Sequence, residues 1–288
     1  MAKSQGDRAV SIYYLHDHTL TAPTQATLKA YCDKLGVALR FLKVDGGDAT
    51  GGLPACSLIP ELAWYRTLLP DLLPELDRVL YLDTDIIVRE SLAGLFDMEL
   101  GDKYGACIND YLAAIAHPEV ARNINIAYEK YFNSGVMLLN LKTLRRDGGG
   151  QRILDIARKN IDHLHFPDQD ALNLAIGFNA HLVSPRWNYP ALSGEYFSRY
   201  SGNPAVNMPA CHEVRERSFS PVILHYSAHP KPWNTFNPLP WFADYHRHRA
   251  QTPWPRSAAD SAKLWRRSLL PMSLIRVVQR VKKALRGK

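Results

Sequence analysis

The feature that most constrains how this sequence can fold is an alternation of short apolar segments with longer segments of helical periodicity. Strands and helices that follow one another in this order build α/β folds with helices against the sheet. The predicted strands cover residues 10–15, 37–44, 78–82, 104–108 and 135–141. The predicted helices cover residues 21–36, 61–69, 151–164 and 168–176. This alternation favours a parallel α/β sheet.

Residues 185–255 depart from the alternation because they are rich in Pro, Trp, Tyr and His. We expect them to form loops and short strands that line a site. The chain has 288 residues, of which 46% are apolar, and this is enough for one large core with a small appendage. We therefore expect a single domain at 1–255 and a separate tail at 256–288.

The net charge of +7 is distributed unevenly along the chain. Residues 261–288 contain nine Lys or Arg and no Asp or Glu, which leaves a net charge of −2 on the remaining residues. An enzyme that acts on nucleic acid is expected to spread its positive charge over a groove on its body. We therefore expect no nucleic-acid partner.

The cysteines and the first residues indicate the cellular compartment. Cys32, Cys56, Cys107 and Cys211 form no C-x-x-C pair, which favours free, packed thiols in a reducing compartment. Residues 1–8 lack the apolar stretch of a secretion signal, and no apolar run of about 18 residues follows. We expect a cytoplasmic protein that does not span a membrane.

Two carboxylates follow the predicted strand 78–82. Residues i and i+2 of an extended segment point to the same face, so Asp83 and Asp85 form a cradle for a divalent cation. Ligands of open α/β sheets bind beyond the carboxyl ends of the strands, where this pair lies. Because D-x-D also arises by chance, and Asp168 with Asp170 forms another, a polar turn is an equal alternative.

The segment 225–233 strengthens the metal hypothesis. It follows an apolar run and combines His225 and Lys231 with a Pro-x-Pro frame. A neutral imidazole can complete the coordination of Mn²⁺, which accepts mixed oxygen and nitrogen ligands. Lys231 can neutralise phosphate as a point charge. For His225 alone, a structural histidine at a strand end is the alternative.

Two further segments have the character of a polar pocket floor. Asn-Ser-Gly at 133–135 precedes an apolar run, and its small residues would let a ligand approach the backbone. Asp-Gln-Asp at 168–170 opens a helix, where carboxylates favour the positive end of the helix dipole. As a helix cap, this acidic pair requires no function.

Taken in order, the segments 81–85, 133–136, 168–173 and 225–233 resemble the motifs of glycosyltransferase family 8. The resemblance covers roughly residues 9–240. It implies the A-type glycosyltransferase fold, a Rossmann-like mixed sheet flanked by helices. It also implies a retaining enzyme, like the family's bacterial lipopolysaccharide galactosyl- and glucosyltransferases.

The resemblance implies roles for individual residues. The ligands of Mn²⁺, or of Mg²⁺ in its place, would be Asp83, Asp85 and His225. The residues that bind a UDP-sugar donor would be Arg66, Asp83, Asn133, Ser134 and Lys231. The catalytic residues around the transferred hexose would be Asp110, Asp168 and Gln169.

The resemblance also implies how transfer would proceed. The metal and Lys231 would stabilise the charge on the leaving UDP, and the leaving phosphate would take the acceptor's proton in a same-face displacement. We favour this route over a covalent intermediate because the amide of Gln169 is a poor nucleophile. The acceptor would be a lipopolysaccharide or a related, lipid-linked surface glycan.

The sequence departs from the family pattern at two places, and both could affect enzymatic activity. The family usually opens with a strand and a helix that grip the nucleotide, whereas this sequence starts at the family's second strand, 10–15. A gap in the sheet is therefore expected, with either a start codon further upstream or an impaired enzyme. Ala228 stands where many relatives have Gly, and its methyl group could crowd the phosphate.

The basic tail predicts a membrane contact. Residues 272–286 place an apolar stripe beside a basic one, as in an amphipathic helix. We expect 261–288 to bind an anionic membrane surface, at about 1 kcal/mol for each cation near it. The protein would then be peripheral on the inner face of the cytoplasmic membrane. The alternative is a helix that docks on the protein's own body.

Two rival functions stay open at this point. A metal-dependent phosphohydrolase could use Asp83, Asp85 and His225, with His16 and His18 as further ligands. An inactive relative could bind a membrane or a partner without turnover. The absence of a Walker-type glycine loop and of G-x-G-x-x-G disfavours nucleotide kinases and dinucleotide oxidoreductases.

Overall fold

The structure, a computed structural model, describes residues 8–45, 50–51, 53, 61–234, 241–257 and 259–262. The chain divides into two compact units, Met1–His225 and Tyr226–Lys288, and each is described by itself. Nearly all of the predicted basic tail, 263–288, lies outside the described residues. The predicted division of the chain at residue 256 therefore stays a prediction.

The first elements form a β-α-β unit of β1 (Ser11–His16), α1 (Ala22–Lys34) and β2 (Ala38–Lys43). The two strands are parallel. The helix starts where the sequence predicts, because the side chain of Thr21 accepts a hydrogen bond from the backbone of Thr24. In the described residues these strands form a sheet of their own.

The central sheet is mixed, not parallel as the alternation predicted. Its strand order is β3 (Arg78–Leu82), β6 (Phe132–Asn140), β5 (Gly105–Asn109) and β7 (Ala180–Val183). β6 runs antiparallel to β3 and β5, whereas β5 and β7 are parallel. β6 starts at the edge where its neighbours end, since Val136 pairs with Leu82 and Phe132 with Asn109. This direction brings 133–135 to the carboxyl ends of both neighbours.

At this edge β6 contains a bulge against β5 but not against β3. Against β5, the pairing jumps from Cys107 with Met137 to Ile108 with Asn133. Against β3, Asp83 still donates a backbone hydrogen bond to Gly135, at 2.8 Å. Bulges bend a strand and redirect its side chains, so residues 133–135 turn toward the end of β3.

A third, small sheet has the order β4 (Ile86–Val88), β9 (Ile223–His225) and β8 (Tyr189–Pro190). β9 is antiparallel to β4 and parallel to β8. In this register Ile86 and Pro190 both pair with His225.

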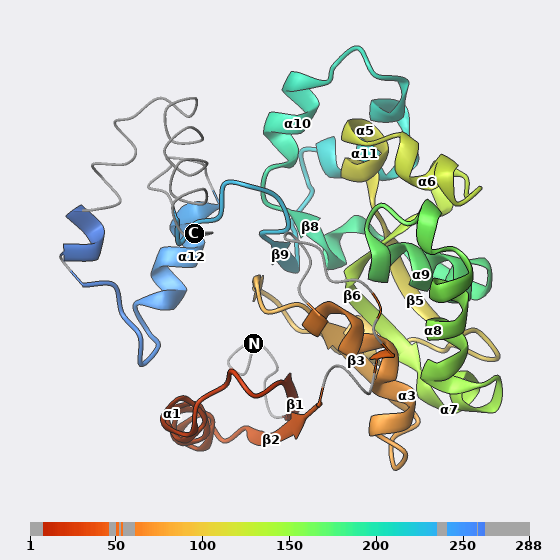
Figure 1. Ribbon diagram of the computed structural model, residues 1–288. Helices are drawn as coiled ribbons and strands as arrows, with labels where there is room; N and C mark the ends of the chain where they lie inside the picture. Colours follow the sequence, from red (N-terminus) through yellow and green to blue (C-terminus); the bar gives the residue numbers. More distant parts are fainter. Residues whose placement is uncertain are drawn as a thin grey trace, which may run out of the picture. The chain divides into compact units, whose positions relative to one another are not determined.

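Helices flank the central sheet, as Figure 1 shows for α8 and α9. The predicted helices at 151–164 and 168–176 correspond to α8 (Gly149–Lys159) with the 3-10 turn η4 (Ile161–His163), and α9 (Pro167–Ile176) with η5 (Gly177–Asn179). The predicted helix at 61–69 is the 3-10 helix η2 (Glu61–Leu68), followed by α3 (Leu69–Leu72). Short helices that the sequence did not indicate are α4 (Ala93–Phe96), α5 (Tyr111–Ala116), α6 (Glu119–Asn123), η3 (Tyr128–Lys130) and α7 (Leu141–Arg146).

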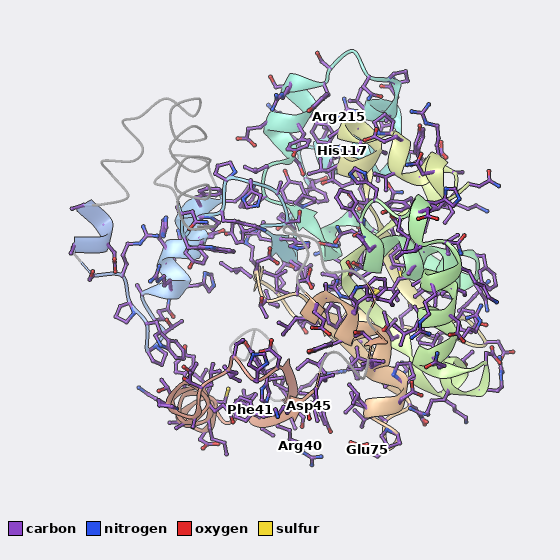
Figure 2. The ribbon with its side chains drawn as sticks, viewed as in Figure 1. Arg40, Phe41, Asp45, Glu75, His117 and Arg215 are labelled. Atoms are coloured by element: carbon purple, nitrogen blue, oxygen red, sulfur yellow. The ribbon has the colours of Figure 1, made fainter. Side chains whose placement is uncertain are left out.

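The core lies on both faces of β6. Met137 and Leu139 pack on one side with residues of α7, α8 and α9, and Val136 and Leu138 pack on the other with residues of α4 and β9. Side chains fill the space around the sheet (Figure 2). Burial on both faces explains why this strand reads as a continuous apolar run.

The prediction that 185–255 holds only loops and short strands is wrong. The segment contains η6 (Pro185–Trp187), α10 (Ser193–Arg199), η7 (Pro204–Asn207), α11 (Pro209–Arg215) and α12 (Phe242–Arg249). Pro185, Pro204 and Pro209 each occupy a first helical turn. Proline is favourable there, because the backbone N–H that it lacks would have no helical partner. These three prolines therefore mark helix starts.

Three cysteines confirm their predicted packing role. Cys32, Cys107 and Cys211 are free and buried, and burial raises the pKa of each thiol, that of Cys211 to about 11. Cys56 lies outside the described residues. Among the helices described, none combines the length and the apolar character that a bilayer crossing requires.

Candidate active site

Three predicted metal ligands converge at the edge where β3 ends. Asp83 follows β3, Asp85 precedes β4, and His225 ends β9. Nε2 of His225 lies 3.2 Å from Oδ1 of Asp85 and 3.7 Å from Oδ2 of Asp83. One ligand atom from each residue lies within 4.8 Å of the other two. Two carboxylate oxygens and one imidazole nitrogen fit a borderline cation such as Mn²⁺.

The orientation of the His225 ring is determined by Asn188, at the end of η6. Nδ1 of His225 lies 2.8 Å from Oδ1 of Asn188. An amide oxygen only accepts hydrogen bonds, so Nδ1 carries a proton, and Nε2, which faces the carboxylates, is the nitrogen that would bind a metal. Nδ2 of Asn188 in turn donates to Oδ1 of Asn133, at 2.9 Å. No sequence motif marked Asn188, a polar residue between Trp187 and Tyr189.

Gly135 leaves the space that the imidazole occupies. A Cβ atom at this position would lie 2.4 Å from Cε1 of His225, 2.8 Å from Oδ2 of Asp83 and 3.0 Å from Oδ1 of Asn133. These distances are far below van der Waals contact, so any side chain would displace the ring. The glycine in the bulge of β6 is therefore part of the site's geometry.

Arg66 of η2 connects Asp83 to the sugar side of the predicted site. The guanidinium is buried, with Nη2 at 3.2 Å from Oδ1 of Asp83 and Nε at 3.4 Å from Oδ2 of Asp168. Nη1 donates to the carbonyl and the hydroxyl of Ser134. The guanidinium carbon Cζ lies 4.7 Å from the ring centroid of Tyr81, whose hydroxyl donates to Asp83 at 2.7 Å. Burial alone would lower the pKa of Arg66, but its acidic neighbours raise it overall.

Asp168 is 4% exposed, and this burial raises the pKa of its carboxyl group to about 6. The charge of Arg66 acts in the opposite direction and favours the ionised form. Burial is the larger effect. Asp168 can therefore change its charge just below neutral pH.

Gln169 is held at both ends of its amide. Its Nε2 donates to Oδ2 of Asp110 and to the hydroxyl of Tyr131, both at 3.0 Å, and its Oε1 accepts from the backbone N–H of Ser134, also at 3.0 Å. Oδ2 of Asp110 also accepts from Asn133, at 3.0 Å. A continuous network of polar side chains thus runs from Arg66 to the imidazole. Sequence reasoning missed Tyr131, which no motif marked.

Asp170, in contrast, has a structural role at the start of α9. It is fully buried, and its oxygens accept hydrogen bonds from the Tyr131 hydroxyl and from the backbone N–H groups of His165 and Phe166. Asp170 therefore holds the backbone just before α9, although the N-cap residue itself, Phe166, makes no side-chain cap hydrogen bond. Asp168 faces Arg66 instead.

Lys231 belongs to the second unit, Tyr226–Lys288. Its Nζ donates to the backbone carbonyls of Tyr226 and Ser227 and lies 5.7 Å from the ring centroid of Trp233. Its predicted contact with phosphate stays a prediction. His16 and His18, the extra ligands of the phosphohydrolase hypothesis, are not part of the Asp83 group among the described residues.

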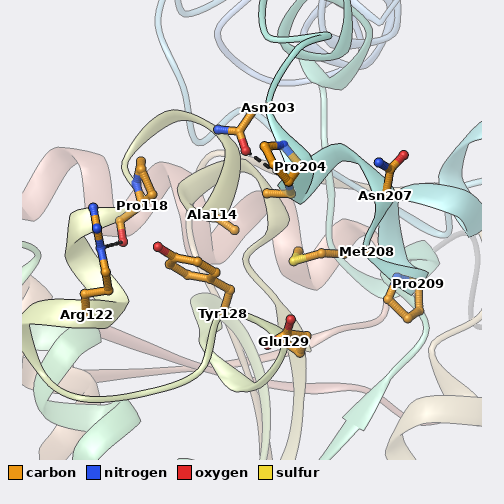
Figure 3. Close-up of a pocket in the computed structure, with 11 residues that line it drawn as sticks. Ala114, Pro118, Arg122, Tyr128, Glu129, Asn203, Pro204, Asn207, Met208 and Pro209 are labelled. Carbon is orange, nitrogen blue, oxygen red and sulfur yellow. Dashed lines mark hydrogen bonds between the residues drawn. The ribbon is translucent and has the colours of Figure 1, made fainter.

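A separate cavity of about 670 Å³ lies beside α5 and α6, and Figure 3 shows it. None of the predicted site residues lines it. Its walls are Ala114, Pro118, Arg122, Tyr128, Glu129, Asn203, Pro204, Ala205, Asn207, Met208 and Pro209.

Comparisons with known proteins agree with the motifs. The family model described as glycosyl transferase family 8 matches residues 33–236. General stress protein A of Bacillus subtilis (strain 168) is 28% identical over 86% of this chain and 85% of its own length. Lipopolysaccharide 1,2-glucosyltransferase of Escherichia coli is 29% identical over 79% of this chain and 65% of its own length.

The fold also matches a solved structure. The galactosyltransferase LgtC, in complex with donor and acceptor sugar analogs, superposes with a TM-score of 0.72 and 21% identity. The match covers 88% of this chain and all of LgtC. This confirms the predicted A-type glycosyltransferase fold.

The close approach at Gly135 can be tested with one methyl group. In Gly135→Ala the new Cβ displaces the His225 ring, and we expect Mn²⁺ affinity to fall about tenfold or more. Isothermal titration of the metal-free protein with Mn²⁺ measures this. Gly194→Ala is the matched control, because a Cβ at Gly194 meets nothing within 4 Å. Equal affinities in the two variants would show that Gly135 does not shape the site.

The raised pKa of Asp168 predicts a pH-dependent stability. The pKa of Asp168 is raised from its usual value of 3.8 to about 6. Between these two pH values the carboxyl group keeps its proton in the folded protein and loses it in the unfolded chain. The protonated carboxyl group therefore stabilises the folded state at low pH. The free energy of unfolding falls by about 3 kcal/mol as the pH rises through about 6. Asp168→Asn removes this pH dependence.

Urea unfolding of the metal-free protein at about pH 4 and pH 7 measures the effect. We expect the free energy of unfolding of the native chain, relative to that of Asp168→Asn, to decrease from the lower pH to the higher. A relative increase would mean that the ion pair with Arg66 outweighs burial.

Proposed function

Because the chain belongs to glycosyl transferase family 8, we propose that it transfers glucose or galactose from a UDP-sugar to a lipopolysaccharide or a related surface glycan. The observation that carries this proposal is the convergence of Asp83, Asp85 and His225 on one point. The named activities of the lipopolysaccharide glucosyltransferase and of the galactosyltransferase LgtC support the choice of hexoses.

The donor set supports a metal-dependent reaction. Mn²⁺, or Mg²⁺, bound by Asp83, Asp85 and His225 would act as a Lewis acid toward the charge that develops on the leaving diphosphate. Asn188 holds the imidazole in the tautomer that can bind a cation. Arg66 and Tyr81 hold Asp83 in place from the other side. These three residues thus position the ligands.

The hexose would lie against the network of Asp110, Asn133, Ser134 and Gln169. Hydroxyl groups of a sugar can exchange hydrogen bonds with amide and carboxylate side chains of this kind. Because every member is already fixed by a protein partner, the pocket is preorganised, and little reorganisation is needed during transfer. Asp168 would complete the set, since the guanidinium of Arg66 contacts both Asp168 and Ser134.

The side chains present favour a same-face displacement with retention. Gln169 is an amide with both ends engaged, and the oxygens of Asp170 hold α9, so neither is a free nucleophile. The bond between the anomeric carbon and the phosphate oxygen would break as the acceptor oxygen bonds to the same face. The acceptor's proton would pass to the leaving phosphate, which makes a protein base unnecessary. Lys231 would neutralise that phosphate.

The basic tail gives a hypothesis for where the reaction takes place. A lipid-linked acceptor lies at a membrane surface, and the nine cations of 261–288 would hold the protein on an anionic leaflet. We therefore propose that the enzyme is a peripheral protein on the inner face of the cytoplasmic membrane.

The experiment that tests the function is hydrolysis and transfer with a panel of UDP-sugars, with and without Mn²⁺. We expect UDP-glucose or UDP-galactose to be preferred, and activity to require the metal. Asp85→Asn should lower kcat by about a hundredfold or more, since it removes a ligand of the metal that stabilises the leaving group.

Asp162→Asn, which changes an exposed carboxylate of η4, is the matched control. It should turn over at the rate of the native chain. Release of phosphate from simple esters without sugar transfer would replace this proposal with a phosphohydrolase. No turnover of any UDP-sugar would support the inactive relative.

A further inference from the structure

We propose that His117, Glu119 and His165 form a second metal site, which binds a transition metal of the Zn²⁺ class. These residues lie outside the site described above and come from two segments of the chain, 117–119 and the residues just before α9. His117 follows α5, Glu119 begins α6, and His165 precedes α9. The segment around His117 can be followed in Figure 2.

The three side chains already have the mutual distances of a ligand group. One ligand atom from each lies within 4.8 Å of the other two. Nδ1 of His117 is 3.5 Å from Oε1 of Glu119, and the centroids of the two imidazole rings are 5.9 Å apart. Small rotations about the side-chain torsions bring such atoms to bonding distance of about 2 Å from a shared ion.

The types of ligand in this second group differ from those in the group of Asp83, Asp85 and His225. Two imidazoles and a carboxylate are the protein ligands of many open zinc sites, where water takes the remaining position. The group at Asp83 has one nitrogen and two carboxylates, which suits a harder cation such as Mn²⁺. The side chains of His117 and Glu119 are 49% and 46% exposed, so a metal can enter from solvent.

The backbone anchors the ligands on two helices. The N–H of His117 donates to the carbonyl of Ala113 in α5, at 2.7 Å. The N–H of His165 donates to the buried carboxylate of Asp170 in α9, at 2.6 Å. The His165 ring packs edge-to-face on Phe166, with centroids 4.7 Å apart. A bound ion would therefore tie the end of α5 to the start of α9.

This tie would act on the helices that carry the proposed hexose pocket. Asp110 caps the start of α5, Gln169 lies in the first turns of α9, and the two side chains are joined by a 3.0 Å hydrogen bond. A metal at the other end of α5 would stabilise this arrangement. Pro118, between two of the ligands, also lines the cavity of Figure 3, so the ion would lie near its rim.

The test uses the full chain, freed of metal by a chelator, in an Asp85→Asn background that weakens the first site. Isothermal titration with Zn²⁺ should show one equivalent bound. Adding His165→Gln should lower the affinity at least tenfold. His163→Gln is the matched control, because His163 is exposed, lies two residues away and is not in the group. It should leave the affinity unchanged.

Two further readouts separate metal binding from folding. Co²⁺ should give visible absorption bands in the Asp85→Asn chain that disappear with His165→Gln. Zn²⁺ should raise the Tm of the Asp85→Asn chain and not that of the chain that also carries His165→Gln. The two chains should have equal circular dichroism in the absence of metal. Equal Zn²⁺ affinity with and without His165 would overturn the proposal. Failure of the Asp85→Asn chain to bind Zn²⁺ would also overturn it, and would leave the group as surface side chains that pack together without a metal.

Discussion

The backbone pairing between β4 and β9 is the constraint on which the whole candidate site depends. Ile86 pairs with His225, so the ladder places an imidazole beside Asp85, which lies far away in sequence. Because side chains alternate across a strand, a slip of one residue would turn the imidazole to the opposite face. The carboxylates would then have no nitrogen partner. Ile223 of β9 packs into the core beside Val136 and Leu138, and this burial opposes such a slip.

A second consequence of the strand arrangement is that the site is held rigidly. The bulge in β6 puts Gly135 against the imidazole and Ser134 against Arg66. A buried guanidinium would be costly without partners, and here two carboxylates and two oxygens of Ser134 surround it. Removing one partner would leave another charge uncompensated. The guanidinium of Arg66 therefore links the proposed metal ligand Asp83 to Asp168 and Ser134, which are proposed to lie near the sugar.

The sequence predicted the parts of this site that depend on local geometry. Asp83 and Asp85 could be paired because i and i+2 share a face of an extended segment, and Asp168 could be placed at a helix start. The predicted A-type glycosyltransferase fold is confirmed by the match to LgtC. Asn188 and Tyr131 could not be found, since each acts only through a partner brought near by tertiary structure. The direction of β6 was missed for the same reason: the alternation of strands and helices carries no information about antiparallel insertion.

The central claim is that one imidazole, that of His225, shares a divalent cation with the two carboxylates. Electron spin-echo spectroscopy of Mn²⁺ bound to the full chain with UDP detects a directly coordinated nitrogen. We expect modulation from a single imidazole nitrogen that disappears in His225→Gln and persists in His212→Gln, a change at an exposed histidine of α11. The same modulation in both variants, or none in the native chain, would contradict it.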